Sequence, residues 1–106
     1  MTDKVKWLSY EFTSYMPNTT WYDVAGVYIF CGVNAQNQWV LFYVGQAESF
    51  RDRLSSHEQW GPALRQGATH VHVMVVSQAA TRDVIERELI QAYQPRLNTQ
   101  LRHSVV

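Results

Sequence analysis

The sequence predicts an α+β fold, in which a small three-stranded antiparallel β-sheet is flanked by helices. Residues 26–31 and 40–44 are rich in β-branched and aromatic side chains and enclose a polar loop, which is the pattern of a β-hairpin. Residues 70–76 alternate as a third strand does. Residues 77–93 then place apolar side chains at helical offsets, and this pattern stops at Pro95. The order strand, strand, helix, strand, helix favours one sheet that is covered by helices.

The first helix is expected between the hairpin and the third strand. Residues 47–57 place Phe50 and Leu54 four positions apart, with charged residues between them, and Ser49 is a plausible N-cap. A Trp-Gly-Pro break at residues 60–62 follows and leads into a short segment before the third strand.

Length and composition favour one small domain over residues 1–106, since a chain of this size can close one hydrophobic core. Apolar residues make up 46% of the sequence, but no apolar stretch is long enough to cross a bilayer, so no membrane association is expected. The first residues carry no signal-peptide pattern, and we therefore expect a cytoplasmic protein.

Residues 1–23 form an aromatic-rich N-terminal extension that the strand and helix patterns do not assign. Its aromatic side chains, which include Trp7, Phe12 and Trp21, could pack over the core or could stack on unpaired bases. We favour packing, because aromatic side chains most often serve burial. A protein-interaction surface is a third interpretation, with no motif behind it.

Cys31 and two histidines are interpreted as structural residues. Cys31 is the only cysteine and lies within an apolar run, which favours a small core residue over a nucleophile. His70 and His72 lie two apart on the predicted third strand and could share a metal. Since no third ligand follows at a matching spacing, we expect them to line the sheet.

The charge balance argues mildly against nucleic-acid binding, because nine basic residues are matched by nine acidic ones. Two local clusters could still form a basic patch. Arg51, Arg53 and Arg65 make up the first cluster, and Arg96, Arg102 and His103 make up the second.

Two tripeptides in the predicted hairpin begin a longer series, Gly-Val-Tyr at residues 26–28 and Tyr-Val-Gly at residues 43–45. An arginine and a histidine on one face of the first helix follow, then a glutamate in the second helix and an asparagine after it. The polar side chains of the series are Tyr28, Tyr43, Arg53, His57, Glu86 and Asn98. From residue 26 to residue 98 the sequence resembles the GIY-YIG nuclease family. The resemblance implies the GIY-YIG nuclease fold and a metal-dependent endonuclease that hydrolyses phosphodiester bonds in DNA.

The resemblance implies that Glu86 binds a single metal ion, Mg²⁺ or Mn²⁺. One carboxylate suits Mg²⁺, since this ion keeps much of its hydration. Glu88 points about 200° away on a helix, so only one of the two glutamates can face the site, and family spacing selects Glu86. Taken alone, Glu86 would be interpreted as a solvated helix charge that pairs with Arg82.

The other site residues have distinct expected roles. The planar guanidinium of Arg53 is expected to bind the scissile phosphate. His57, one helical turn later, would lie beside it and help the base or contact the phosphate. For Tyr28 the resemblance implies a general-base or water-positioning role, and a base would need a nearby cation to lower its pKa. Tyr43 is a second site residue, and Asn98 is expected to tie the C-terminal tail to the core.

Two neighbouring positions complete the series. Gly45 ends the second predicted strand, where backbone geometry or the close approach of a ligand explains a glycine. Gln46 departs from the family pattern, because several members carry a basic residue there, and one phosphate contact is therefore expected to be missing.

The alternative function is a catalytically weak or inactive module of the same fold that binds nucleic acid or another protein. The neutral, short chain favours weak DNA binding and reliance on a homodimer, a fused partner or an assembled partner.

Overall fold

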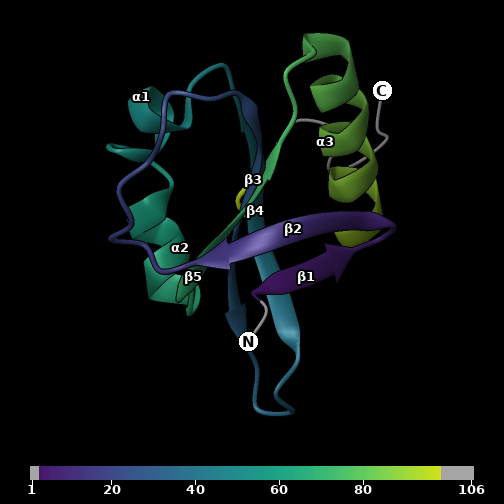
Figure 1. The fold of residues 1–106 in the computed structure, drawn as a ribbon. Helices are drawn as coiled ribbons and strands as arrows, with labels where there is room; N and C mark the ends of the chain where they lie inside the picture. Colours follow the sequence, from purple (N-terminus) through teal and green to yellow (C-terminus); the bar gives the residue numbers. More distant parts are fainter. Residues whose placement is uncertain (1–2, 99–106) are drawn as a thin grey trace.

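The computed structural model describes residues 3–98, which form one antiparallel sheet and three helices (Figure 1). The strands are β1 (Lys4–Trp7), β2 (Tyr10–Tyr15), β3 (Gly26–Val33), β4 (Trp39–Ala47) and β5 (His70–Val75). The helices are α1 (Phe50–Leu54), α2 (Trp60–Gln66) and α3 (Ala79–Tyr93). The strand order is β1-β2-β5-β3-β4, so that β4 forms one edge of the sheet and β1 forms the other.

The α+β class is confirmed, but the predicted number of strands is wrong, because the described residues contain a five-stranded sheet in place of a three-stranded one. Both additional strands come from the N-terminal extension. β1 and β2 form a hairpin, and β2 pairs with β5 through Thr13 and Val73. The turn of this hairpin includes Leu8 at a φ of 57°, which is uncommon for any residue other than glycine. The turn of this hairpin therefore lacks the residue types that usually identify a hairpin in a sequence.

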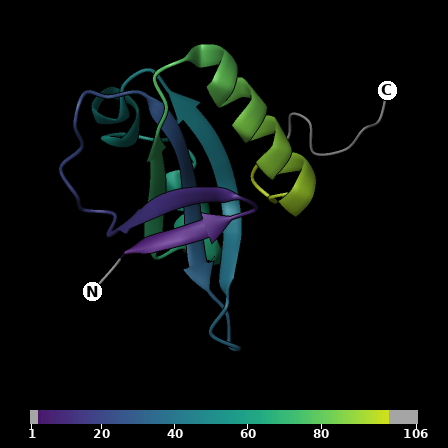
Figure 2. The same cartoon turned by 45° about the vertical axis from the view of Figure 1, so that its right-hand side comes forward.

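The aromatic residues of the extension mostly pack into the core. Phe12 is fully buried, and Trp7 and Trp21 are exposed by 4% and 9%. Tyr22, in contrast, is 80% exposed. The extension thus belongs to the same sheet, which it continues beyond β5 (Figure 2).

The helices begin and end at different residues from those predicted. α1 is shorter than residues 47–57, because β4 extends into the start of that range and α1 ends before its last turn. Ser49 is the N-cap of α1, and its hydroxyl accepts a hydrogen bond from the Asp52 backbone N–H at 3.2 Å. The Trp-Gly-Pro segment, predicted as a break, instead begins α2. Pro62 lies in its first turn, where a missing N–H removes no helical hydrogen bond. Within residues 3–98, no helix combines the length and hydropathy that crossing a bilayer requires.

Alternate residues of β3 face opposite sides of the sheet. Val27, Ile29 and Cys31 pack in a cluster with apolar residues of α3, whereas Tyr28 and Phe30 pack in a cluster with residues of α1 and α2. Figure 1 shows α3 on one side of the sheet and α1 and α2 on the other. We call these sides the α3 face and the α1/α2 face.

Candidate active site

Tyr28 and Tyr43 approach each other diagonally across β3 and β4. The strand register pairs Tyr28 with Gly45 and Tyr43 with Phe30, and the centroids of the two tyrosine rings lie 6.2 Å apart. A Cβ atom at Gly45 would lie 2.4 Å from the Tyr28 ring, so glycine is needed for this ring to lie across β4. Gly45 therefore lies inside β4, not at its end as predicted, and the group that approaches it closely is Tyr28.

His57 contacts Tyr28 from the loop after α1, and the prediction that it shares a helix face with Arg53 is wrong. Its Nε2 atom lies 2.7 Å from Tyr28 Oη, and its Nδ1 atom accepts a hydrogen bond from the Gln59 backbone N–H at 3.0 Å. Because Nδ1 accepts, the ring proton is on Nε2, which donates to Tyr28 Oη. Burial, and then the charge of Arg53, lowers the pKa of His57 to about 4, so the ring is neutral at pH 7.

The two phenols stay protonated at neutral pH. Burial raises the pKa of Tyr28, the neighbouring Tyr43 adds to the rise, and the charge of Arg53 opposes it. Burial also raises the pKa of Tyr43, again against the charge of Arg53. A cation therefore lies near both phenols, as a general base would require, but the effect of burial is larger.

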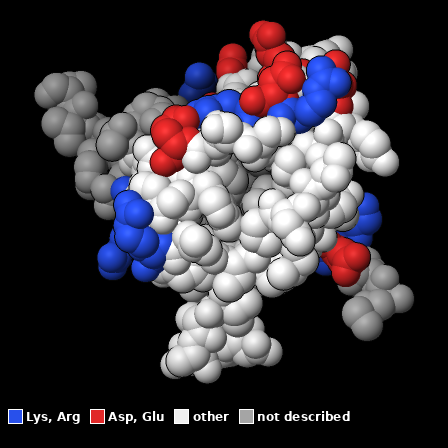
Figure 3. All heavy atoms as spheres, turned by 90° about the vertical axis from the view of Figure 1, so that its left-hand side faces the viewer, with Lys and Arg blue, Asp and Glu red and all other residues white. Residues whose placement is uncertain are grey.

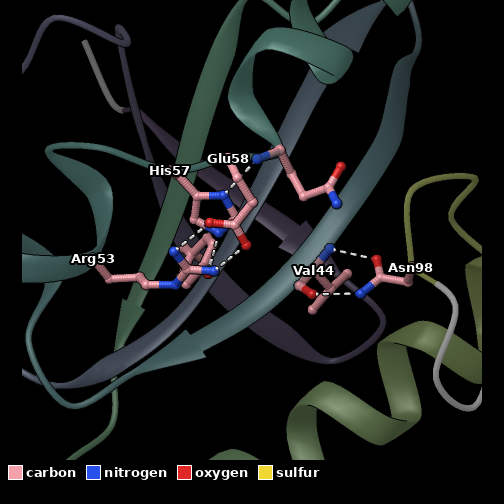
Figure 4. Close-up of polar contacts among 7 residues, drawn as sticks. Val44, Arg53, His57, Glu58 and Asn98 are labelled. Atoms are coloured by element: carbon pink, nitrogen blue, oxygen red, sulfur yellow. Dashed lines mark hydrogen bonds and ion pairs between the residues drawn. The ribbon is translucent and has the colours of Figure 1, made fainter.

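Glu58 binds the guanidinium of Arg53 in a two-point ion pair (Figure 4). Arg53 Nη1 and Nη2 donate to the two Glu58 carboxylate oxygens at 2.9 and 2.8 Å. This hydrogen bonding raises the pKa of Arg53 and lowers the pKa of Glu58 to about 2. The Glu58 and Arg53 side chains are 65% and 35% exposed. Since carboxylate and phosphate oxygens bind the same fork of donors, a phosphate at Arg53 would replace Glu58.

Glu86 of α3 is joined to β4 through Gln46. The Gln46 side-chain amide donates to Glu86 Oε1 at 2.9 Å and to an Asp83 carboxylate oxygen, and its own oxygen accepts from Arg82 Nε at 3.2 Å. Burial raises the pKa of Glu86, the hydrogen bond from Gln46 opposes this rise, and the charge of Asp83 adds to it. Arg82 is buried and donates to two backbone carbonyls before α3, so the described residues show no Arg82–Glu86 ion pair.

These contacts form two groups on the two sides of β4. The phenol group consists of Tyr28, Tyr43, Arg53 and His57, and the carboxylate group consists of Gln46, Asp83 and Glu86. The negative charge of Glu86 contributes to the raised pKa of both phenols, so the two groups are within electrostatic reach of each other. An open depression of about 380 Å³ touches one residue of each group, and it is lined by Gln46, Ala47, Glu48, Ser49, Asp52 and Arg53.

Asn98 occupies the outer edge of β4 at Val44 (Figure 4). Its Oδ1 accepts from the Val44 N–H and its Nδ2 donates to the Val44 carbonyl, both at 2.8 Å, as a neighbouring strand would. Leu97 N–H donates to the Phe42 carbonyl at 3.2 Å. Asn98 is fully buried, and the segment after α3 is thereby held along β4.

Cys31 and the two histidines of β5 lie outside these groups. Burial raises the pKa of the Cys31 thiol, which disfavours a reactive thiolate. His72 is fully buried, and its Nδ1 accepts a hydrogen bond from Trp7 Nε1 at 2.9 Å. Over residues 3–98, no three His, Cys, Asp or Glu side chains come together as a multi-ligand metal site.

The first expected basic cluster is largely neutralised. Arg51 lies 3.4 Å from Asp23 and 3.3 Å from Asp52, and Arg53 is paired with Glu58. Figure 3 shows basic and acidic side chains next to one another at the rim of the α1/α2 face. In the second cluster Arg96 is exposed, while Arg102 and His103 lie outside the described residues.

Glu58 and Asp83 were not predicted from the sequence, and for Gln46 only a missing phosphate contact was expected. Glu58 lies five positions after Arg53, which is not a helical spacing, so its ion pair depends on the loop after α1. Arg82 and Gln46 form a network that only the packing of α3 on β4 reveals, although the departure at Gln46 was a signal.

The comparisons with known proteins agree with this fold. Residues 24–99 match the family model of the UvrC-like GIY-YIG domain. UvrABC system protein C from Chlamydia trachomatis and from Chlamydia muridarum is 34% identical over 84 residues, or 73% of this chain. The chain spans only 13% of the length of these relatives.

A relative of known structure is bound to a divalent cation. The N-terminal endonuclease domain of UvrC from Thermotoga maritima, bound to magnesium, has a TM-score of 0.59 and 28% identity to this chain. The match covers 74% of this chain and 88% of that domain. An asparagine-to-alanine mutant of that domain, also bound to its catalytic divalent cation, matches with a TM-score of 0.60 and 26% identity. The chain belongs to the UvrC-like GIY-YIG domain family.

Proposed function

We propose that the chain is a metal-dependent endonuclease that hydrolyses phosphodiester bonds in DNA at a single-cation site. Family membership supports a nuclease-type function, and the Thermotoga maritima relative is an endonuclease domain bound to magnesium. The observation that carries the proposal is the placement of Arg53 and Glu86 on the two sides of β4, with both phenols in electrostatic reach of each.

In this proposal Arg53 binds the scissile phosphate. Hydrolysis builds negative charge on the phosphate oxygens, and a fixed pair of N–H donors stabilises this charge. The two-point binding of the Glu58 oxygens supports this role, because two phosphate oxygens can bind the same pair of donors. Because both side chains are partly exposed, Glu58 can leave without any rearrangement of the core.

Tyr28 positions the attacking water instead of removing its proton. His57 donates to Tyr28 Oη, which leaves the phenol proton and the second lone pair of Oη for other partners. Since the raised pKa keeps the phenol protonated, Tyr28 can orient the water or donate to a phosphate oxygen. The water oxygen forms the new bond to phosphorus while the bond from phosphorus to one ester oxygen breaks. The proton that the water loses passes to solvent, and the departing oxygen takes up a proton from solvent. Tyr43 adds a second phenol beside this position.

The carboxylate group fits a hydrated divalent cation. A half-buried carboxylate next to a second carboxylate is destabilised when ionised, and a cation would reverse this effect on Glu86. Mg²⁺ or Mn²⁺ requires few protein ligands, and Gln46 holds the Glu86 carboxylate in place. Such an ion, when bound, stabilises the charge of the departing oxygen.

We also propose that DNA binding by this domain alone is weak. The formal net charge is 0, and Arg51 and Arg53 are paired with carboxylates. Few basic side chains are therefore available to bind phosphates. A second copy, a fused partner or an assembled partner would supply the additional affinity.

A cleavage assay with matched variants tests the proposal. The purified chain is incubated with supercoiled, linear, branched and single-stranded DNA, in Mg²⁺, in Mn²⁺ or in EDTA. Glu86→Gln removes one charge at constant size, and Glu88→Gln is the control on the exposed part of the same helix. We expect cation-dependent cleavage that falls at least about 100-fold in Glu86→Gln and persists in Glu88→Gln. Equal loss in both variants, or no cleavage under any condition, would contradict the proposal.

The second candidate is a DNA-binding module without useful turnover. It is favoured by the ion pair of Glu58, which occupies the phosphate-binding fork. Binding of DNA without cleavage in either metal ion would select this candidate.

A further inference from the structure

A pocket of about 310 Å³ opens on the α1/α2 face beside His57. Its walls include Trp21, Phe30, Ser55, Ser56, His57 and Trp60. Figure 3 looks onto this face, whose centre is hollowed and shows neither basic nor acidic side chains. The pocket is separate from the depression lined by Gln46 and Arg53, because the two share no lining residue.

The chemistry of the walls suits a flat, uncharged and partly polar ligand. Four of the named residues are aromatic or imidazole rings, and His57 is neutral at pH 7 because its pKa is lowered. Trp60 is only half-buried and is the most exposed ring of the set. Ser55 and Ser56 are exposed residues of the pocket lining, and the Ser55 hydroxyl donates to the Arg51 carbonyl. The volume of the pocket is at the small end of the range for ligand pockets, which begins at roughly 300 Å³.

His57 connects this pocket to the proposed site of hydrolysis. The same imidazole forms part of the pocket wall and lies 2.7 Å from Tyr28 Oη. An occupant of the pocket would therefore be separated from Tyr28 by one side chain. A nucleotide whose phosphate reached Arg53 could place its base there, since Arg53, Ser55 and Ser56 all belong to α1 and the loop after it.

Part of the pocket is supplied by residues before the family match. Pro17 and Trp21 line it, whereas the match to the UvrC-like GIY-YIG domain begins at residue 24. Trp21 is held by a T-shaped contact with Tyr15, with ring centroids 5.6 Å apart, and by a contact with Phe50. The N-terminal extension thus builds a wall that the matched region lacks.

We propose that this pocket receives one unstacked base of the DNA strand held at Arg53, so that the preferred substrate carries an unpaired nucleotide next to the scissile phosphate. The proposal rests on the proposed function and names its substrate class. Every base presents a flat face to an aromatic ring, so such a pocket selects an unpaired base over a paired one with little regard to sequence. A base in an intact duplex must first leave the stack, and a bulged or single-stranded base avoids most of this cost.

Binding measurements without cleavage test the pocket directly. DNA hairpins that carry 2-aminopurine, either as a one-nucleotide bulge or fully paired, are titrated with the protein in EDTA. Gly61→Leu fills the pocket from α2, where a Cβ atom would meet only Arg65 Nη1, at 3.7 Å. Ala80→Leu adds a leucine at an exposed helical position away from the pocket and is the matched control. The thermal unfolding midpoint of each variant verifies that the fold is kept.

We expect the protein to bind the bulged hairpin at least about tenfold more tightly than the paired one, with a drop in 2-aminopurine emission as the base stacks. Gly61→Leu should abolish both the preference and the emission change, and Ala80→Leu should keep both. An equal affinity for the two hairpins, or a preference that survives in folded Gly61→Leu, would overturn the proposal and assign the pocket to another occupant.

Cleavage of the same hairpins in Mg²⁺ separates the two proposals. Cleavage without a bulge preference overturns the base pocket alone. A bulge preference without cleavage overturns the nuclease proposal and leaves the pocket supported as a DNA-binding element.

Discussion

Alternate residues of β3 enter two environments that differ in chemistry. On the α3 face, Val27, Ile29 and Cys31 are fully buried among apolar side chains. On the α1/α2 face, Tyr28 is equally buried, but it carries a hydroxyl that needs a partner and finds it in His57. A buried polar group without a partner costs about 1–3 kcal/mol, so the second face depends on one specific contact.

The difference shows why the proposed site lies along β4. The α3 face stabilises the sheet, while the α1/α2 face provides the phenols and Arg53. Glu86 comes from α3, and it reaches the same region only beside the edge strand, where Gln46 contacts it. A central strand such as β3 has a neighbouring strand on both sides, so side chains from the two faces cannot meet beside it. Variants on the two faces and at the edge strand can test this division between a stabilising face and the edge that carries the proposed site.

The largest effect on stability is expected at Asn98, which satisfies both polar backbone groups of Val44 at the edge. Asn98→Ala would leave both groups without their partner and should lower the free energy of unfolding by about 2–4 kcal/mol. Asn18 is exposed, and Asn18→Ala should change it by less than about 0.5 kcal/mol. Urea denaturation of both variants measures the difference, and equal effects would show that the edge contact contributes little.

A pair of glycine variants separates the phenol group from the rest of the α1/α2 face. Gly45→Ala would place a methyl group against the Tyr28 ring and should cost about 1–3 kcal/mol of stability, with a loss of cleavage. Gly61→Ala makes only an ordinary contact with Arg65 Nη1, at 3.7 Å, and should be neutral or stabilising by up to about 1 kcal/mol. Thermal unfolding and cleavage rates of the two variants provide the test. A Gly45→Ala protein that cleaves normally would show that the position of Tyr28 is unimportant.

Two buried histidines, one on each face, predict how stability depends on pH. Burial is the main cause that lowers the pKa of His57 and of His72 to about 4, compared with about 6.5 in the unfolded chain. Between about pH 4 and about pH 6.5 the unfolded state therefore binds more protons than the folded state. The free energy of unfolding should fall as the pH drops below about 6.5. At pH 5 the loss should be on the order of 1–2 kcal/mol per histidine.

Urea denaturation of the protein and of His72→Gln from pH 7 to pH 5 checks this dependence. The fall should be smaller in the variant, because one of the two histidines is absent. A free energy of unfolding that is constant over this range would show that neither imidazole is buried as described.

The smallest effect is expected at Glu58. Glu58→Gln removes the charge that competes with phosphate at Arg53, and it should lower KM for DNA severalfold with little change in kcat, because exposed ion pairs are weak. The carboxylate Asp23 pairs with Arg51 at 3.4 Å and does not line the depression, so Asp23→Asn is the control. An increase in KM in Glu58→Gln would mean that Glu58 supports Arg53 instead of competing for it.

The patterns that could be predicted from sequence were the long and periodic ones. The β3–β4 hairpin, β5 and α3 lie within a few residues of their predicted ranges, because their apolar periodicity is strong. The β1–β2 hairpin was missed, because its turn contains Leu8 at positive φ and no glycine or asparagine. α2 was missed because Pro62 resembles a helix breaker, although the first turn of a helix tolerates proline.

The candidate site was only partly accessible from sequence. The family resemblance selected residues on β3, β4, α1 and α3, and packing alone decided their contacts. His57 was placed on a helix because it follows Arg53 by four positions, yet α1 ends between them. Glu58 carried no signal, since its ion pair depends on the path of a loop.

The most direct test of the central claim, that the phenol and carboxylate groups share one cation and phosphate site beside β4, is a Mn²⁺ titration followed by backbone amide NMR. Paramagnetic Mn²⁺ broadens nearby signals, and those of Gln46, Arg53 and Glu86 should disappear first, while signals at the His70 end of β5 persist. Glu86→Gln should remove this pattern, and Glu88→Gln should keep it. Broadening that is centred elsewhere, or that is unchanged in Glu86→Gln, would contradict a shared site.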